Sequence, residues 1–152
     1  MNLMKFKKVV VGGTFDFLHK GHKALLSKAF EVGEYVIIGL TSEKMKNQAS
    51  PFEKRKEKLE AFIKNKGEYE IIEIFDPYSI AIDMEELEAI VVSKETKARA
   101  QEINEIRKKK GLKPLKIIEI PMVLAYDGKP ISSTRIRRGE IREDGSKKSK
   151  KS

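Results

Sequence analysis

Short apolar runs alternate with amphipathic stretches along most of the chain. The apolar runs have the length and β-branched content of buried strands. They cover residues 8–11, 35–40, 69–75, 89–92 and 115–120. Between them, apolar faces repeated at i, i+4 spacing predict helices over residues 21–32, from 50 onward, and over 96–110. Because strands that alternate with helices favour parallel pairing through right-handed crossovers, we expect a three-layer α/β domain with a parallel five-stranded sheet.

Individual residues mark several boundaries of these elements. Ser50 and Glu53 have the spacing of a capping box, which predicts a helix that begins with Ser50 as its cap. Gly33 is expected to end the first helix. The acidic run 83–88 is a further candidate helix, and a last short helix is expected to begin within residues 131–138.

Length and composition limit the organisation of the chain. Its 152 residues predict one domain, over residues 1–145, followed by a Lys/Ser-rich tail over residues 146–152 that is expected to be disordered. The chain has no cysteine, which excludes disulfides, thiolate nucleophiles and cysteine-based zinc sites.

The charge and hydropathy patterns bear on partners and location. The formal net charge is +9. The last 18 residues hold eight basic and three acidic residues, so much of the basicity belongs to the last helix and the tail. The first residues lack the apolar core of a signal peptide, and no apolar run approaches membrane-spanning length. We therefore expect a cytoplasmic protein without a membrane partner.

Both histidines of the chain lie at the predicted start of the first helix. His19 and His22 are three positions apart, with Gly21 between them. Free backbone N–H groups and the positive end of the helix dipole attract anions to a helix start. Imidazoles at i and i+3 can face one phosphate there. The alternative is a plain strand–turn–helix connection with two surface histidines, but the clustering of both copies favours phosphate chemistry.

The glycine-rich turn before these histidines supports the same interpretation. Gly12 and Gly13 let a ligand approach the backbone closely, and Thr14 offers a hydroxyl to a phosphate. The turn matches neither the P-loop pattern nor the dinucleotide fingerprint. In a parallel sheet, loops after several strands meet at the carboxyl edge, so Ser93 after the fourth strand and Ser132 at the last helix are expected at the same place.

Two segments resemble signatures of the nucleotidyltransferase superfamily. The run from Gly13 to His22 resembles the H-x-G-H signature, and the run from Ile131 to Arg137 resembles the I-S-S-T-x-x-R signature. A narrower resemblance, over residues 7–139, is to archaeal-type phosphopantetheine adenylyltransferases. This resemblance implies a Rossmann-like nucleotidyltransferase domain. It also implies transfer of the adenylyl group of ATP to 4′-phosphopantetheine, which yields dephospho-coenzyme A and pyrophosphate with Mg²⁺ assisting.

The resemblance also implies roles for individual residues. Thr14 would orient the attacking phosphate, and His22 would stabilise the α-phosphate in the transition state. Lys46 would contact the transferring phosphates, with Lys44 as its alternative. Nucleotide binding is expected from Gly12, Gly13, His19, Gly21, Ser93, Ser132, Ser133, Thr134 and Arg137. No metal-ligating residue is predicted, because Mg²⁺ usually relies on substrate phosphates and water.

Several alternatives stay open at this point. Ser93 could contact adenine or ribose, or take part in plain helix capping. The two signatures also fit transferases whose acceptor is flavin mononucleotide, nicotinamide mononucleotide, glycerol phosphate or choline phosphate. The basic tail allows a nucleic-acid-binding module, although no recognised nucleic-acid motif is present and no nucleic acid is required by the chemistry. The oligomeric state does not follow from the sequence.

Overall fold

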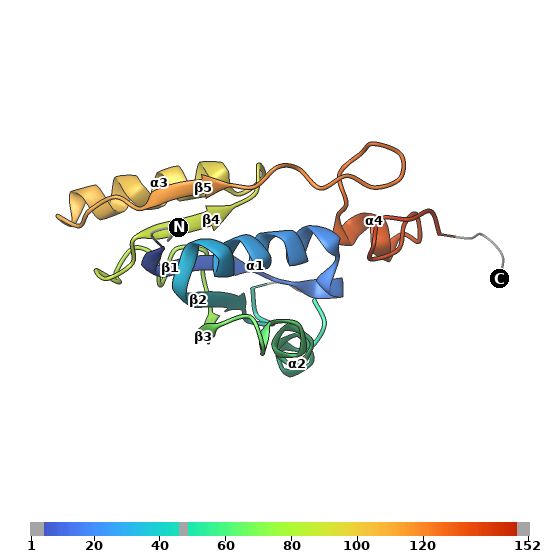
Figure 1. Cartoon of the computed structure of the whole chain (residues 1–152), viewed down its shortest axis with the longest axis horizontal. Coiled ribbons are helices and arrows are strands. Elements are labelled where there is room, and N and C mark those ends of the chain that lie inside the picture. The colour runs from blue at the N-terminus through green and yellow to red at the C-terminus, as the bar shows by residue number, and fades with distance from the viewer. Residues whose placement is uncertain (1–4, 46–48, 149–152) are drawn as a thin grey trace.

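The fold is built on a parallel five-stranded sheet, as the sequence pattern predicts (Figure 1). The computed structural model describes residues 5–45 and 49–148. The sheet has the order β3-β2-β1-β4-β5, and every neighbouring pair is parallel. The strands are β1 (Phe6–Gly13), β2 (Gly33–Thr41), β3 (Glu68–Ile74), β4 (Ala89–Val92) and β5 (Lys116–Glu119).

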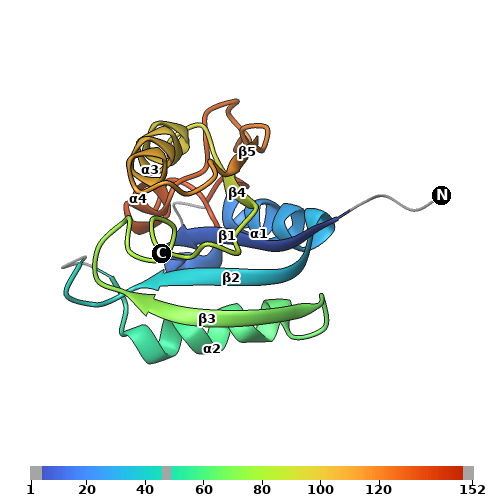
Figure 2. The same ribbon diagram turned by 90° about the vertical axis from the view of Figure 1, so that its left-hand side faces the viewer.

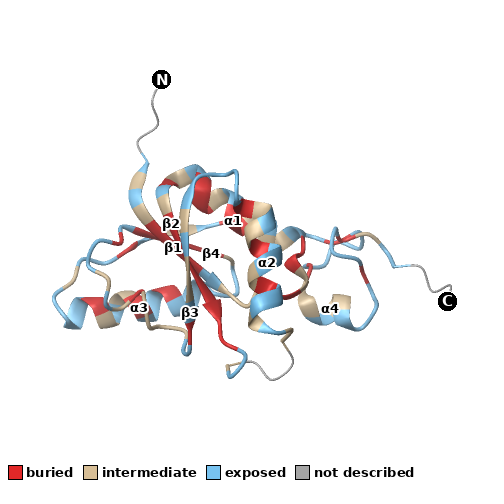
Figure 3. Ribbon diagram, turned by 90° about the horizontal axis from the view of Figure 1, so that it is seen from below, coloured by how far each residue is buried: buried red, intermediate tan, exposed pale blue. Residues whose placement is uncertain are grey.

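Helices cover both faces of the sheet (Figure 2). They are α1 (Lys20–Val32), α2 (Phe52–Ile63), α3 (Lys97–Lys109) and α4 (Ser133–Arg137), with the short 3-10 helix η1 (Asp16–Leu18) before α1. Successive strand residues point to opposite faces. Val9 and Val11 therefore pack with α1 and α2, whereas Val10 packs with α3. The buried residues next to the sheet accordingly form two clusters, one on each side, and a third, small cluster of Ala125, Ile131 and Ile141 lies outside the sheet. Figure 3 shows the burial of each element.

The strand order reverses next to β1. The chain moves outward from β1 to β2 and β3, and then returns to β4 on the other side of β1. In such sheets a crevice opens beyond the carboxyl ends of the strands at the point of reversal. Helix α4 lies at this end of the sheet (Figure 1), so the last signature returns to the loop after β1.

The expected capping box at α2 is wrong. Pro51 occupies the cap position without a side-chain cap bond. The Ser50 hydroxyl instead donates to the Asp16 carboxylate at 2.9 Å. The Phe52 N–H at the helix start donates to Glu43 Oε1 at 2.8 Å. The Asp16 carboxylate, far away in the sequence, thus accepts from Ser50 in place of the nearby Glu53. The reason is that Asp16 is buried and needs hydrogen-bond donors.

One further boundary prediction is wrong, because residues 83–88 form turns rather than a helix. Gly33 ends α1 as predicted, and it already lies in an extended conformation as the first residue of β2. A Cβ on Gly33 would lie 2.5 Å from Val9 Cγ2, so this glycine provides room for β1 rather than a left-handed helix end.

The chain after α4 packs against the domain. Ile141 is fully buried, and the Lys20 N–H at the start of α1 donates to the Glu143 carbonyl at 2.8 Å. Arg142 N–H donates to the Ser146 carbonyl at 2.9 Å. The first residues of the tail predicted over 146–152 therefore contact the domain. Residues 149–152 lie outside the described residues, so the predicted disorder of the tail stays a proposal.

None of the helices in the described residues is both long and apolar enough to cross a membrane.

Candidate active site

A cavity of about 860 Å³ lies at the carboxyl ends of the strands. Its walls come from the loops after β1 and β4 and from the start of α4. All of the sequence-predicted site residues that the structure describes line it, namely Gly12, Gly13, Thr14, His19, Gly21, His22, Ser93, Ser132, Ser133, Thr134 and Arg137. Lys46 lies outside the described residues. The two signatures, more than a hundred residues apart in the chain, therefore share one cavity.

The two histidines form a stacked pair at the start of α1. Their ring centroids are 3.6 Å apart, with an angle of 17° between the planes. His19 Nδ1 accepts from the backbone N–H of Gly21 at 3.0 Å and of His22 at 3.3 Å. His22 Nδ1 accepts from the His19 backbone N–H at 3.2 Å. The pair is thus a reciprocal cap built from imidazoles.

This arrangement fixes the tautomer of both rings. A neutral imidazole carries its proton on one nitrogen, and here Nδ1 is an acceptor in each ring. The proton therefore lies on Nε2 in His19 and in His22. Among the described residues neither Nε2 has a protein partner, so both N–H groups are available to a ligand in the cavity.

The first backbone N–H groups of α1 were expected to be free to bind an anion, but in the structure they have protein partners. Lys20 N–H is taken by the Glu143 carbonyl, and Lys23 N–H donates to the His19 carbonyl at 3.0 Å. The two N–H groups between them are bound by His19 Nδ1. The imidazole Nε2–H groups and the helix dipole therefore remain as the features of this helix start that could attract an anion.

Gly21 explains how the His19 ring reaches its place. A Cβ on Gly21 would lie 2.9 Å from His19 Cε1 and 3.1 Å from Nδ1. The ring therefore folds over the glycine backbone, and this is the reason for a glycine within the H-x-G-H run.

Burial keeps both histidines neutral and makes stability depend on pH. Burial lowers the pKa of His19 to about 4. Burial, with the charge of His19 as a second cause, lowers the pKa of His22 to about 3. An unfolded histidine takes up its proton near pH 6.5, well before the native one does. The native state therefore loses stability as the pH falls from 6.5 towards 4, and the contribution is fully present above 6.5.

The predicted loss for His19 between pH 6.5 and pH 5 is about 2 kcal/mol. Urea unfolding at pH 7, 6 and 5 measures it, with His19→Asn as the matched control. Asparagine keeps a capping acceptor but does not titrate in this range. The variant should lose less stability over this interval than the wild type. Parallel pH profiles of the two proteins would contradict the burial of a neutral His19.

The loop between β1 and α1 is held in an unusual backbone conformation. Phe15 has φ 51° and Phe17 has φ 59°, both in the left-handed region that bulky residues rarely adopt. Phe15 is buried, and its ring meets the His22 ring edge-on at 5.3 Å between centroids. Such strain persists where the surroundings impose it, and it often accompanies functional sites. Here it fixes the loop that carries Thr14 and the histidines.

Asp16 joins this loop to the last signature. Its carboxylate accepts from Ser50 Oγ, and its backbone carbonyl accepts from Ser133 Oγ at 3.0 Å. Arg137 Nη2 lies 3.6 Å from Asp16 Oδ2, and the Arg137 guanidinium lies 5.3 Å from the Phe17 ring centre. Arg137 therefore faces the β1 loop, and at 3.6 Å its guanidinium donors are not committed to Asp16.

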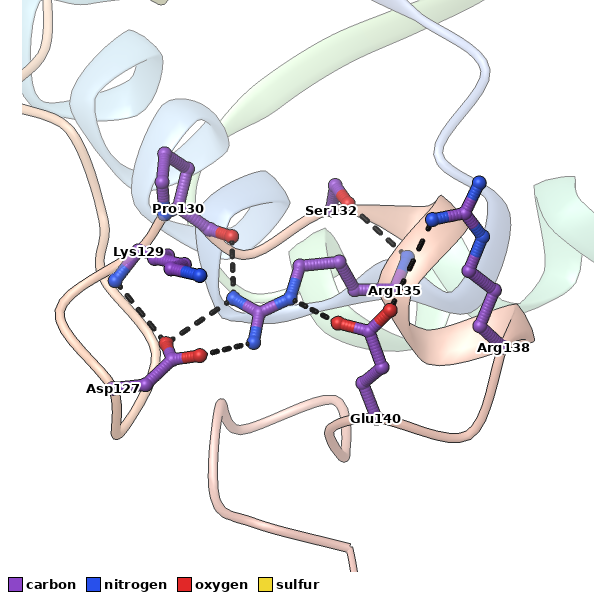
Figure 4. Close-up of polar contacts among 7 residues, drawn as sticks. All are labelled: Asp127, Lys129, Pro130, Ser132, Arg135, Arg138 and Glu140. Atoms are coloured by element: carbon purple, nitrogen blue, oxygen red, sulfur yellow. Dashed lines mark hydrogen bonds and ion pairs between the residues drawn. The ribbon is translucent and has the colours of Figure 1, made fainter.

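The rest of α4 is fixed by structural contacts. Ser132 Oγ caps the helix by accepting from Arg135 N–H at 3.2 Å. The Arg135 guanidinium donates to Asp127 at 2.5 Å and to Glu140 at 2.9 Å, as Figure 4 shows. These donations hold the pKa of the Asp127 carboxyl below its usual range. Arg135 thus anchors α4 to the preceding turn, while Arg137, two residues on, is left for the cavity.

Comparison with known proteins identifies the family of this chain. A family model described as cytidylyltransferase-like matches residues 10–139. A phosphopantetheine adenylyltransferase of Thermococcus kodakarensis is 51% identical over 145 residues, covering 90% of this chain and 88% of the relative. The phosphopantetheine adenylyltransferase of Methanopyrus kandleri is 48% identical over 149 residues, covering 93% and 94%.

The chain belongs to the phosphopantetheine adenylyltransferase family. A crystal structure of a protein of unknown function from Archaeoglobus fulgidus is also similar, with a TM-score of 0.70 and 32% identity. That match covers 82% of this chain and 99% of the other. The resemblance inferred from the two signatures is therefore confirmed, as is the α/β nucleotidyltransferase fold.

Within this family member, Ser93 lies where β4 meets the cavity. Its backbone N–H donates to Thr96 Oγ1 at 3.1 Å, which closes a tight turn before α3. Thr96 is the cap residue of α3 but makes no side-chain cap bond. The hydroxyl of Thr96 therefore shapes the cavity wall instead of capping the helix, and the contact of Ser93 with nucleotide stays a prediction.

Sequence reasoning missed a buried arginine beneath the site. Arg55 of α2 is 2% exposed and donates to the Thr14 carbonyl and to Thr41 Oγ1. A signal was present, because Arg55, Leu59 and Ile63 recur at i, i+4 spacing on the buried face of the helix. A cation on an apolar helix face calls for buried acceptors.

Proposed function

We propose that the protein transfers the adenylyl group of ATP to 4′-phosphopantetheine, giving dephospho-coenzyme A and pyrophosphate. The observation that carries this proposal is the convergence of both signatures on one cavity, in a chain about half identical to curated phosphopantetheine adenylyltransferases. The acceptor phosphate attacks the α-phosphate in line, and no covalent intermediate with the protein is formed.

The chemistry of the site fits this reaction. The acceptor phosphate is already a nucleophile at pH 7, so the site needs alignment and charge stabilisation rather than a base. Nε2–H of His22 donates to the α-phosphate oxygens as charge develops on them, and Nε2–H of His19 contacts the nucleotide phosphates. Thr14 orients the attacking phosphate. Ser93 and the two glycines of the β1 turn, Gly12 and Gly13, approach the nucleotide.

The last signature and Lys46 complete the proposed phosphate contacts. Arg137 forks onto the β- and γ-phosphates, because its guanidinium can donate two parallel hydrogen bonds to a phosphate. Thr134 and the start of α4 lie beside it. Lys46, which follows β2 in the chain, is proposed to contact the transferring phosphates.

Mg²⁺ belongs to this proposal as a companion of ATP. In the described residues no group of three or more His, Asp or Glu side chains could hold a metal ion. Asp16 lines the cavity, but its carboxylate is engaged by Ser50 and by the Phe17 N–H. This donor set fits a Mg²⁺ ion held by the triphosphate and water, where it would neutralise phosphate charge. A cytoplasmic location, with no membrane partner and no need for nucleic acid, completes the proposal.

An acceptor panel tests the substrate assignment. The purified protein is incubated with ATP or CTP and, in turn, with 4′-phosphopantetheine, flavin mononucleotide, nicotinamide mononucleotide and glycerol phosphate. Pyrophosphate release is measured. We expect turnover with ATP and 4′-phosphopantetheine, and at least a hundredfold lower kcat/KM for the other pairs. Turnover with another acceptor and none with 4′-phosphopantetheine would overturn the assignment.

A further inference from the structure

The register of the sheet brings two threonines together at the cavity floor. β1 and β2 are parallel, with Gly13 paired to Leu40, so the next residues, Thr14 and Thr41, lie side by side. Thr41 Oγ1 donates to Thr14 Oγ1 at 3.1 Å. Thr41 also lines the cavity, but it is only 6% exposed, and its hydroxyl is hydrogen-bonded to Thr14 and Arg55.

Arg55 sets the direction of this hydrogen bond. Its Nη1 donates to Thr41 Oγ1 at 3.3 Å and to the Thr14 carbonyl at 3.1 Å. A guanidinium only donates, so Thr41 accepts from Arg55 and passes its single hydrogen to Thr14. Thr14 Oγ1 then accepts, and its own hydrogen is left for a ligand in the cavity that Thr14 lines.

Packing alone does not account for a cation at this place. Arg55 is 2% exposed, and its hydrogen-bond acceptors among the described residues are neutral oxygens, the third being the Ser50 carbonyl at 2.7 Å. The carboxylates of Asp16, Glu43 and Glu73 act on it through their charge alone. Burying a charge without a hydrogen-bonded counter-charge is costly. Donation from a cation, however, strengthens and polarises each hydrogen bond that follows it in a chain. The series of hydrogen bonds from Arg55 through Thr41 ends at the Thr14 hydroxyl, in the cavity proposed to bind the substrates.

We propose that Arg55 and Thr41 are positioning residues that turn the Thr14 hydroxyl hydrogen towards the acceptor phosphate. This inference rests on the proposed adenylyl transfer. Without the hydrogen bonds from Arg55 to Thr41 and from Thr41 to Thr14, the Thr14 hydroxyl could rotate and present a lone pair to the phosphate. The lone pair and the phosphate oxygens would repel each other. These two hydrogen bonds thus remove one unproductive orientation of the Thr14 hydroxyl before the acceptor binds. Their effect is expected on turnover rather than on ATP binding.

A double-mutant cycle on Thr14 and Thr41 tests the proposal. Thr41→Val keeps the shape of the side chain and removes the hydroxyl, and Thr41→Ser is the matched control that keeps it. We expect Thr41→Val to lower kcat about five- to tenfold, the effect of one oriented hydrogen bond, with KM for ATP within twofold. Thr41→Ser should retain kcat within about twofold. In the Thr14→Val background, Thr41→Val should change kcat less than twofold.

The possible outcomes separate the hypotheses. Equal effects of Thr41→Val with and without Thr14→Val would overturn the positioning role, as would equal losses for Thr41→Ser and Thr41→Val. Thermal unfolding of each variant checks the fold, and Thr41→Ala replaces Thr41→Val in the cycle if the valine variant does not fold. A wild-type protein without turnover of ATP and 4′-phosphopantetheine would instead contradict the proposed function itself.

Discussion

Replacing His22 with asparagine is expected to lower kcat about a hundredfold to a thousandfold while ATP affinity changes less than threefold. The Nδ1 of His22 caps the loop by accepting from His19 N–H, and its Nε2–H is left as a donor in a residue that lines the cavity. Asparagine places an acceptor near the position of Nδ1 but carries nothing at the position of Nε2. The substitution therefore removes the donor aimed at transition-state charge and preserves the cap. Steady-state kinetics and calorimetric titration with ATP measure the two quantities.

His22→Gln provides the matched comparison for this prediction. Glutamine places an N–H donor near the position of Nε2 and lacks the acceptor at Nδ1. We expect it to retain more kcat than His22→Asn, although it should be the less stable of the two in urea unfolding. If both variants lose kcat and ATP affinity in equal proportion, His22 acts in ground-state binding only.

The second large effect is expected at Arg137. Arg137→Gln should weaken ATP binding about ten- to hundredfold, because a hydrogen bond to a charged group contributes about 1.5–3 kcal/mol. The guanidinium stacks on Phe17 and lies 3.6 Å from Asp16, so it is held at the cavity with donors to spare. Its removal takes away the proposed fork onto the β- and γ-phosphates. Titration with ATP measures the affinity directly.

Arg138→Gln is the control for the loss of one positive charge in the same helix turn. Arg138 has a side chain 70% exposed and lies 3.9 Å from Glu140, away from the cavity lining. ATP affinity should therefore stay within about twofold of wild type. A comparable loss in both variants would show a general effect of charge rather than a specific contact of Arg137.

The sequence predicted the site well where the signal was local. The H-x-G-H run places two imidazoles and a glycine at one helix start, and capping bonds between residues three apart then bring the rings together. Helix α4 begins within the predicted residues 131–138, and its cap, Ser132, needs only a partner three residues on. The β4 strand is also found over the predicted residues, since four consecutive apolar residues between polar loops leave little freedom.

The failures have a shared physical origin in distant partners. Ser50 was expected to cap α2, but the carboxylate of Asp16, 34 positions earlier, takes its hydroxyl. The N–H groups of α1 were expected to be free, but the Glu143 carbonyl binds the first of them. An argument from residue spacing considers only partners that are close in sequence. A buried acceptor from a distant position takes the hydrogen bond when leaving that acceptor unpaired would cost more free energy than losing the local bond.

By itself, the sequence determined the fold class, the family and the chemical groups of the site. Periodicity fixes which residues are buried, and the two signatures fix which residue types line the cavity. Only the tertiary structure decided how those groups are presented. It paired the backbone N–H groups at the start of α1 with protein acceptors and fixed both imidazoles with the proton on Nε2. It also placed Arg55 beneath Thr14. The reason is that the direction of a hydrogen bond depends on the partners of both atoms, and the chain supplies those partners from distant positions only once it is folded.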